Sequence, residues 1–322
     1  MKAKPLALRG LYPAPSVPFD RDLKIIEGEF ARHLAAMGRI DGLGGVAVNG
    51  HQGEVAALTP RERLRVVELA RENLPKDKHV VAGVLSPSID DMAQQMKDAK
   101  RAGADAALVI PPFDYMPRRV LTRSWQAPYG FFAGLADRCD LPIVVFQYPF
   151  ASNIYYSTEA MTRIAEIDTV VGVKHAIRNL GLYAEQWEAL RGKISVLAAR
   201  DAPGLLTKMF VGSDGCCIGI ANIAPEHWAA FTTQCLESRY NEARETFMTR
   251  LLPLMQHCWA ENQPRATTHS ASTKEALRLL GVFSSSRVRP PEQDVDEEES
   301  AEIRIGLEKA GLLAVPRLRA AG

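Results

Sequence analysis

The sequence predicts an α/β protein: a (β/α)8 TIM barrel followed by a C-terminal helical appendage. Eight short apolar runs recur up to about residue 240, and an amphipathic stretch follows each of them. Such alternation is typical of a parallel sheet whose strands are connected by helices. The runs are continuously apolar, as expected for strands covered on both faces. Their number, and the length of chain that holds them, favour a closed barrel over an open sheet.

The eight expected strands come in order along the chain. They are Tyr12–Val17, Gly44–Val48, Val80–Val84, Ala106–Ile110, Ile143–Gln147, Val170–Lys174, Ile194–Ala198 and Gly215–Ile220. No glycine-rich dinucleotide fingerprint follows the first of them, which disfavours an open nucleotide-binding sheet.

Helix start signals stand between the strands. Thr59 precedes Pro60 and lies three residues before Glu62, which is the pattern of a capping box with proline at the first helical position. Ser88 and Ser157 open similar patterns, and Ala224-Pro225 begins the helix after the eighth strand. These signals predict crossover helices.

After Tyr240 the strand signals stop and helical patterns remain. We expect helices over Glu242–Cys258, Thr273–Leu280 and Glu297–Ala310. The acidic start of the third suits the positive end of a helix dipole. The sequence therefore predicts a catalytic barrel over residues 1–240 and a helical appendage over residues 241–322.

Composition excludes several classes of function. The chain has 322 residues, of which 47% are hydrophobic and 24% charged, and its net charge is +1. This balance gives no reason to expect nucleic acid or an anionic membrane as a partner. No run approaches the roughly 20 apolar residues of a membrane helix, and the start lacks the apolar core of a signal peptide.

The cysteines indicate neither disulfides nor a metal site. The chain has five of them, an odd number without a regular framework, which suggests reduced thiols and a cytoplasmic protein. The adjacent pair Cys216-Cys217 has no histidine at ligand spacing, so buried core residues are expected there. We expect no metal and no cofactor.

Lys174 is the most informative residue, because it ends the apolar strand Val170–Lys174. Lysine is almost never fully buried without a partner, and burial disfavours the charged form of an amine. A neutral amine can attack a carbonyl carbon and form a Schiff base. A lysine that reaches out of the strand end to a carboxylate is the alternative. The carboxyl ends of barrel strands are where active sites lie, which favours the first interpretation.

Two other strand ends carry polar or aromatic residues. The second strand runs into Gly50-His51-Gln52-Gly53-Glu54, a turn whose backbone N–H groups can face an anion, although a plain connecting turn is the alternative. The fifth strand ends in Phe146-Gln147-Tyr148-Pro149, where alternation places Phe146 and Tyr148 on one face. Core packing of these aromatic rings is the alternative there.

With these motifs the chain resembles the dihydrodipicolinate synthase/N-acetylneuraminate lyase family of Schiff-base lyases. The matching segments cover essentially the whole chain: Leu11–Asp20, Gly50–Glu54, Leu58–Arg63, Gly103–Asp105, Pro111-Pro112, Gly172–Lys174, Gly212–Gly215 and Ala221-Asn222. The resemblance implies a (β/α)8 barrel, a homotetramer or homodimer, and a lysine that binds pyruvate or another 2-keto acid. Lys174 matches that lysine, and Gly50–Glu54 matches the turn that binds the keto acid carboxylate.

Several family positions differ in this chain. Phe146 stands where the family has the tyrosine that shuttles protons, and His51-Gln52 replaces its Thr-Thr pair. Asp114, beside Phe113, replaces a second tyrosine, and Ala151 replaces an arginine of the synthases. These departures argue against a true dihydrodipicolinate synthase. The stretch Glu261–Ser270 looks longer than is usual for the family, and either reshapes the appendage or forms a plain surface loop.

The proton shuttle therefore needs another residue. Tyr148, two residues beyond Phe146, ranks first, His51 second and His175 third, since His175 should point away from Lys174. Asp201, at the seventh strand end, is expected either to bind a polyol tail or to cap a helix. Its neighbour Arg200 is expected either to pair with a distal carboxylate or to be a surface charge. The resemblance adds a further set of substrate contacts: His51, Gln52, Gly53, Phe146, Asp201 and Ile218.

Three functions stay open. The first is a class I lyase that forms a Schiff base between Lys174 and a 2-keto acid during aldol cleavage or condensation. The second is a dehydratase of 2-keto-3-deoxy sugar acids that uses the same lysine. The third is a barrel that binds a keto acid without turnover, but simple carboxylate binding would not need a buried amine.

Overall fold

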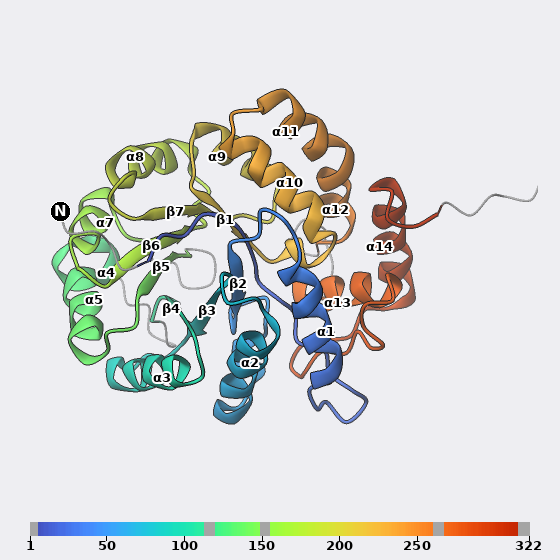
Figure 1. Ribbon diagram of the computed structural model, residues 1–322, viewed down its shortest axis with the longest axis horizontal. Coiled ribbons are helices and arrows are strands. Elements are labelled where there is room, and N and C mark those ends of the chain that lie inside the picture. Colours follow the sequence, from blue (N-terminus) through green and yellow to red (C-terminus); the bar gives the residue numbers. More distant parts are fainter. Residues whose placement is uncertain (1–5, 113–119, 149–154, 260–266, 315–322) are drawn as a thin grey trace, which may run out of the picture.

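The computed structural model describes residues 6–112, 120–148, 155–259 and 267–314. Eight parallel strands form a barrel with helices around it, which confirms the predicted fold (Figure 1). The strands are β1 (Gly10–Pro13), β2 (Gly45–Val48), β3 (His79–Val84), β4 (Ala106–Val109), β5 (Ile143–Gln147), β6 (Val170–His175), β7 (Ser195–Ala198) and β8 (Gly215–Ile218). From β2 to β8, each strand pairs with the next one along the chain, and β8 pairs with β1. A bridge between Leu11 and Leu43 joins β1 to the segment before β2.

The barrel helices follow the strands in the expected alternation. They are α1 (Glu27–Gly38), α2 (Pro60–Asn73), α3 (Ile89–Arg101), α4 (Val120–Arg123), α5 (Gln126–Arg138), α7 (Thr158–Ile164), α8 (Leu180–Leu190), α9 (Gly204–Val211) and α10 (Pro225–Leu236). Short 3-10 turns occupy η1 (Val55–Ala57) and η2 (Ile220–Asn222). The capping box at Thr59 is confirmed: its hydroxyl accepts the Glu62 N–H at 3.3 Å, and the Glu62 carboxylate accepts the Thr59 N–H at 2.9 Å.

In the described part of the chain, four helices follow the barrel and gather on one side of it, near α1 and α10 (Figure 1). They are α11 (Tyr240–Thr246), α12 (Leu252–His257), α13 (His269–Leu279) and α14 (Glu297–Lys309). The domain boundary at residue 240 stays a prediction, because α11 packs directly against α10 and α13 contacts η2.

Several boundaries differ from the expected ones, and two of these differences have identifiable reasons. The strand expected over Tyr12–Val17 is β1, which ends at Pro13, because the prolines at 13, 15 and 18 have no N–H to extend the ladder. The single helix expected over Glu242–Cys258 is divided by a π-helical turn at Phe247–Leu251. Pro253 follows this turn, and proline removes one hydrogen bond of a regular helix.

The apolar core has two layers. The inner layer fills the barrel and includes Tyr12, Leu108, Val144 and Cys217. The outer layer lies between the strands and the helices and is the larger of the two. All five cysteines are buried and unpaired by disulfides.

A register shift in β6 turns Lys174 into the barrel. Ile143 of β5 pairs with Val170, whereas the next residue, Val144, pairs with Gly172. One residue of β6 is therefore extra, as in a β-bulge. Val171 packs in the inner layer, whereas Val170 and Val173 both pack in the outer layer. Strict alternation from Val171 would turn residue 174 outward, and the bulge reverses its direction.

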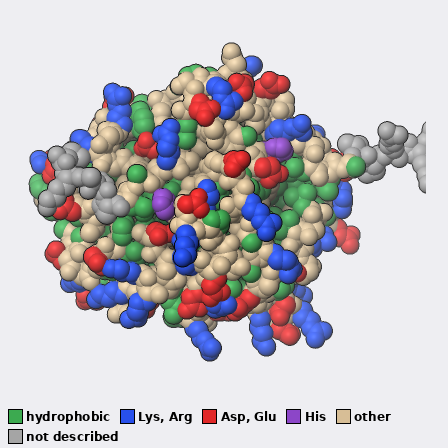
Figure 2. All heavy atoms as spheres, viewed as in Figure 1, with side chains coloured by type: hydrophobic (Ala, Val, Ile, Leu, Met, Phe, Trp, Pro, Cys, Tyr) green, Lys and Arg blue, Asp and Glu red, His purple; other side chains and the backbone are tan. Residues whose placement is uncertain are grey.

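The surface fits the near-neutral composition. On the face shown in Figure 2, acidic and basic side chains are interspersed rather than gathered by sign. Among the helices that the structure describes, none has the length and apolar character needed to cross a membrane.

Candidate active site

A cavity opens at the carboxyl ends of the strands, where the active site of such a barrel is expected. The structure brings most of the predicted site residues to its wall. Those that line it are His51, Gln52, Phe146, Tyr148, Lys174 and Asp201.

Lys174 lies at the base of this group on β6. The residue is only 8% exposed, and its Nζ stands 4.4 Å from the centre of the Phe146 ring. The strand register explains the contact, since Phe146 of β5 pairs directly with Lys174. The Cys217 thiol is a further neighbour: burial raises its pKa, and the charge of Lys174 partly offsets that rise. A primary amine thus faces the cavity beside an aromatic ring and a buried thiol.

Tyr148 and His51 form a hydrogen-bonded pair above Phe146. The Tyr148 hydroxyl lies 2.8 Å from His51 Nδ1, and the ring centroids of Tyr148 and Phe146 are 4.6 Å apart in a stacked arrangement. The family tyrosine is absent at residue 146, but a phenol from the next inward position reaches the same cavity. Because the phenol and the imidazole can exchange a proton through this contact, the pair can carry protons.

The C-terminal segment adds two rings that the sequence reasoning missed. The His51 ring lies 4.5 Å from that of His269, which in turn stacks on Trp259 at 4.8 Å. Both residues line the cavity although they follow the barrel in sequence. Trp259 precedes the stretch Glu261–Ser270 and His269 lies within it, and the expected extra length of this stretch was the available signal. Residues 260–266 lie outside the described residues.

The turn after β2 has the geometry of an anion site. Asn49 and Glu54 bound it, both in the left-handed region with φ of 52° and 53°. Within the described parts of the chain, the N–H groups of Gln52 and Gly53 donate no hydrogen bond. Successive N–H groups in such a turn bind anions. The Gln52 side chain is buried and its Nε2 donates to Ser16 Oγ at 2.9 Å, whereas its Oε1 has no hydrogen-bond partner among the residues that the structure describes.

Two predicted contacts lie away from the cavity wall. Gly53 stands behind it, where an added Cβ would come 3.3 Å from the Pro15 carbonyl oxygen. The Ile218 side chain packs in the outer layer, and its carbonyl accepts the Ala14 N–H at 3.1 Å. The neighbour of Ile218, Cys217, is the β8 residue that packs inside the barrel.

His175 lies on the outer side of β6. It is fully buried, and its Nε2 lies 2.8 Å from Gln186 Oε1 on α8. Burial, and then the charge of Lys208, lower the pKa of His175 to about 3. A histidine that stays neutral and faces the helices cannot exchange protons with a substrate in the cavity.

A second buried lysine, Lys208 on α9, was also missed. Its Nζ donates to the carbonyls of His175 at 2.9 Å and Ala199 at 3.1 Å, which ties the ends of β6 and β7 together. Burial, with the charge of Arg200, lowers the pKa of Lys208 to about 7. Lys208 is not among the residues that line the cavity.

The outer part of the cavity is charged. Arg178 and Arg200, from the segments after β6 and β7, line it together with Asp201. Asp201 Oδ1 accepts the Ile220 N–H at 2.8 Å, so one oxygen of this carboxylate also orders η2. The family positions at Phe113, Asp114 and Ala151 lie outside the described residues.

Comparison with protein families gives a match over almost the whole chain. The model of the dihydrodipicolinate synthetase family matches residues 7–310. The 4-hydroxy-tetrahydrodipicolinate synthase of Phenylobacterium zucineum (strain HLK1) is 32% identical over 305 residues, covering 95% of this chain and 98% of the relative. The enzyme of that name from Rhodopseudomonas palustris (strain BisA53) is 30% identical over 313 residues, covering 97% and 100%.

Solved structures give the same fold. A dihydrodipicolinate synthase crystal structure superposes with a TM-score of 0.83 at 25% identity, covering 95% of this chain and all of the other. The dihydrodipicolinate synthase of Acinetobacter baumannii, complexed with pyruvate, has a TM-score of 0.84 at 22% identity, covering 95% and 100%. A prophage protein of this family from E. coli K12, also in complex with pyruvate, gives 0.82 at 22% identity, covering 95% and 99%.

Proposed function

The chain belongs to the dihydrodipicolinate synthetase family, a family of lyases, and on that premise we propose that Lys174 forms a Schiff base with pyruvate or a related 2-keto acid. The reaction proposed is aldol cleavage or condensation. The observation that carries the proposal is a primary amine on β6 that faces a cavity also lined by His51 and Gln52 of the turn after β2, whose geometry suits an anion. The amine and the turn match the two ends of a 2-keto acid, its carbonyl and its carboxylate.

The chemistry follows from these positions. Lys174 Nζ attacks the C2 carbonyl, and loss of water gives an iminium ion. The electrons of the C3–C4 bond then move toward the iminium nitrogen, which leaves an enamine as the C4 hydroxyl loses its proton and becomes an aldehyde. The enamine takes up a proton at C3, and water releases the keto acid from the lysine.

The Tyr148–His51 pair is the proposed proton carrier. The cleavage step needs a base for the C4 hydroxyl and an acid for C3, and a phenol hydrogen-bonded to an imidazole can serve as both in turn. The 2.8 Å contact between Tyr148 and His51 supports this assignment, since Phe146 has no hydroxyl. His51 belongs to the turn itself, so the proton carrier and the anion site share one loop.

The far end of the substrate is proposed to meet Arg178, Arg200 and Asp201. Two guanidinium groups against one carboxylate favour a substrate with a second anionic group beyond C4. Guanidinium forks bind carboxylates and phosphates well. The relatives are named as synthases, but the loss of the hydroxyl at Phe146 and this charged rim favour a different aldehyde partner.

Borohydride trapping tests the proposal. The protein is incubated with pyruvate and borohydride, digested, and searched for a mass adduct, which we expect on Lys174. Lys208 is an internal control, because it is also a buried lysine but does not line the cavity. An adduct on Lys208 alone, or none with a panel of 2-keto acids, contradicts both the lyase and the dehydratase and leaves the non-catalytic binder. Product analysis separates the two reactions: a keto acid plus an aldehyde, or a dehydrated product that keeps all carbons.

Two further proposals concern the whole protein: a homotetramer or homodimer, and a cytoplasmic location. A dihydrodipicolinate synthase variant described as monomeric is among the similar structures, so the fold alone does not fix the assembly. Sedimentation velocity over a range of protein concentrations measures it directly.

A further inference from the structure

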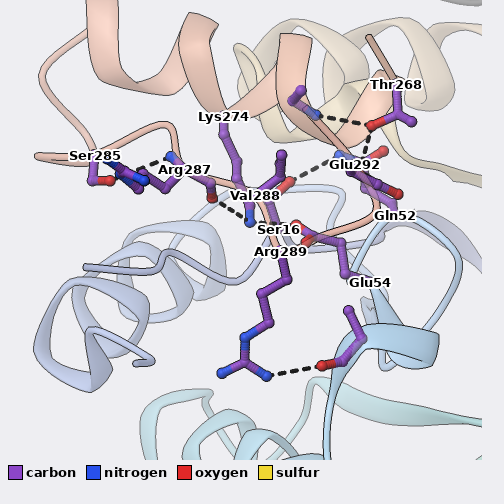
Figure 3. Close-up of polar contacts among 12 residues, drawn as sticks. Ser16, Gln52, Glu54, Thr268, Lys274, Ser285, Arg287, Val288, Arg289 and Glu292 are labelled. Carbon is purple, nitrogen blue, oxygen red and sulfur yellow. Dashed lines mark hydrogen bonds and ion pairs between the residues drawn. The ribbon is translucent and has the colours of Figure 1, made fainter. Parts of the chain in front are cut away.

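A buried ion pair links the C-terminal helices to the turn after β2. Lys274 of α13 contacts the carboxylate of Glu54, and the exposed fractions of the two side chains are 0% and 1%. Lys274 Nζ also donates to the Arg287 carbonyl at 3.0 Å. Figure 3 shows Lys274 reaching from its helix toward the loop that carries Glu54 and Gln52. The pair thus joins residues that are far apart in sequence.

This pair is poorly explained by stability alone. Burial raises the pKa of Glu54, and the charge of Lys274 offsets part of that rise. Burial lowers the pKa of Lys274, and the charge of Glu54 offsets part of that fall. The free-energy cost of removing two charges from water offsets much of their mutual attraction. Apolar residues of similar volume often stabilise a fold as well or better. What a buried pair does supply is a fixed direction for each side chain.

The direction matters because Glu54 ends the turn. Its φ of 53° is a left-handed conformation that side chains rarely adopt, and Asn49 at the other end has φ of 52°. Such conformations persist where the surrounding structure holds them. At one end the Asn49 side chain donates to the Arg63 carbonyl at 2.7 Å, and at the other the Glu54 carboxylate meets Lys274. Between the two lie the N–H groups of Gln52 and Gly53.

A second cation completes the attachment. Arg289 makes two hydrogen bonds to the Glu62 carboxylate, at 2.6 and 2.8 Å, and another to the Ala57 carbonyl at 2.8 Å. Both cations lie against the Phe19 ring, with Lys274 Nζ 4.0 Å and the Arg289 guanidinium carbon 4.3 Å from its centroid. The C-terminal segment therefore holds both the end of the turn and the chain that follows it.

We propose that Lys274 is a positioning residue that, through Glu54, sets the Gly50–Glu54 turn for the carboxylate of the 2-keto acid. The inference rests on the proposed function and adds that keto acid affinity depends on the C-terminal helices. Neither Lys274 nor Glu54 lines the cavity with Lys174, so the pair acts on binding rather than on the chemical step.

The test compares Lys274→Met, Lys274→Arg and the double variant Glu54→Gln/Lys274→Met with the wild type. The readouts are the pyruvate concentration that gives half-maximal borohydride trapping, the trapping at saturation, and the melting temperature. Lys274→Met leaves Glu54 buried without its partner and should lower the melting temperature, whereas the double variant has no buried charge and should recover it. Arg278→Met is the matched control, since it breaks the ion pair with Glu275 on the same helix without touching the turn.

In the two variants that carry Lys274→Met, the half-saturating pyruvate concentration should rise about ten- to a hundredfold, which corresponds to the loss of one charge-assisted hydrogen bond. Trapping at saturation should stay near the wild-type level, and Arg278→Met should match the wild type. Lys274→Arg keeps the charge in another geometry, so it should fold and still need more pyruvate. Wild-type half-saturation in a double variant with a recovered melting temperature would overturn the inference. A wild type that traps no 2-keto acid would instead overturn the proposed function, and with it this inference, before any variant is compared.

Discussion

Replacing Tyr148 with Phe removes one hydroxyl group and little else. The hydroxyl contacts His51 Nδ1 at 2.8 Å, whereas the ring stacks on Phe146 with centroids 4.6 Å apart, a contact that phenylalanine keeps. Tyr148 is only partly buried, so water can replace the lost partner of His51. The free energy of unfolding should fall by about 0.5–1.5 kcal/mol, the net worth of one hydrogen bond.

The effect on turnover should be much larger. Positioned acid–base groups contribute roughly 10²–10⁴-fold to a rate, which corresponds to about 3–5 kcal/mol of barrier. Schiff-base formation needs only Lys174 and the anion site, so borohydride trapping of pyruvate should persist in the variant. The expected pattern is a folded protein that traps pyruvate but cleaves its aldol substrate slowly.

The assay measures kcat for aldol cleavage, with trapping and thermal unfolding on the same samples. Tyr240→Phe is the control, because Tyr240 is 43% exposed and packs against Phe210 on the outside of the barrel. A kcat for Tyr148→Phe equal to that of the wild type and of Tyr240→Phe refutes the assignment of Tyr148 as proton carrier.

Three other predictions test the fold and the substrate. Burial lowers the pKa of His175 from 6.5 to about 3, so the unfolded chain binds the proton more readily; the stability that follows is present above pH 6.5 and lost as pH falls toward 3. Urea unfolding should show a loss of stability between pH 7.5 and 5 that is about 2 kcal/mol smaller in His175→Gln. The remainder is expected because burial also lowers the pKa of His33, to about 4. Gly83→Ala would place a Cβ 1.9 Å from the Asn49 carbonyl oxygen and should lower the free energy of unfolding by several kcal/mol. The matched variant Gly130→Ala in α5 would place its Cβ within 4 Å of none of the described atoms and should raise that free energy by up to about 1 kcal/mol. Equal effects of the two variants in denaturant unfolding would contradict the geometry. Arg200→Met should raise KM at least tenfold for substrates with a distal carboxylate, because a hydrogen bond to a charged group contributes about 1.5–3 kcal/mol. Borohydride trapping of pyruvate should not change. An unchanged KM would show that Arg200 does not contact the substrate.

Local patterns were enough to predict the fold, and together with the family resemblance they indicated where the site should lie. β-Branched runs, a capping box at Thr59 and prolines that end elements act within a few residues, so they can be recognised without knowing what packs on them. The same local patterns placed Lys174 at the end of the sixth strand. They also placed the turn Gly50–Glu54 after the second strand. Tyr148 was placed near Lys174 by alternation along a single strand, and it does line the cavity.

What the sequence did not predict depends on residues distant along the chain. His269 and Trp259 reach the cavity, and Lys274 reaches Glu54, only because the C-terminal helices fold back against the barrel. No periodicity records a contact across more than 200 residues, because it arises from packing rather than from local backbone preference.

The sequence by itself determined that a lysine ends the sixth strand of an eight-stranded barrel, since strand order and turn chemistry are local properties. Only the tertiary structure decided which way that lysine points. The extra residue in β6, seen where Val144 pairs with Gly172, turns Lys174 to the same side as Val171. A bulge is visible only against the neighbouring strand, because it is a mismatch in pairing and not a feature of either strand alone.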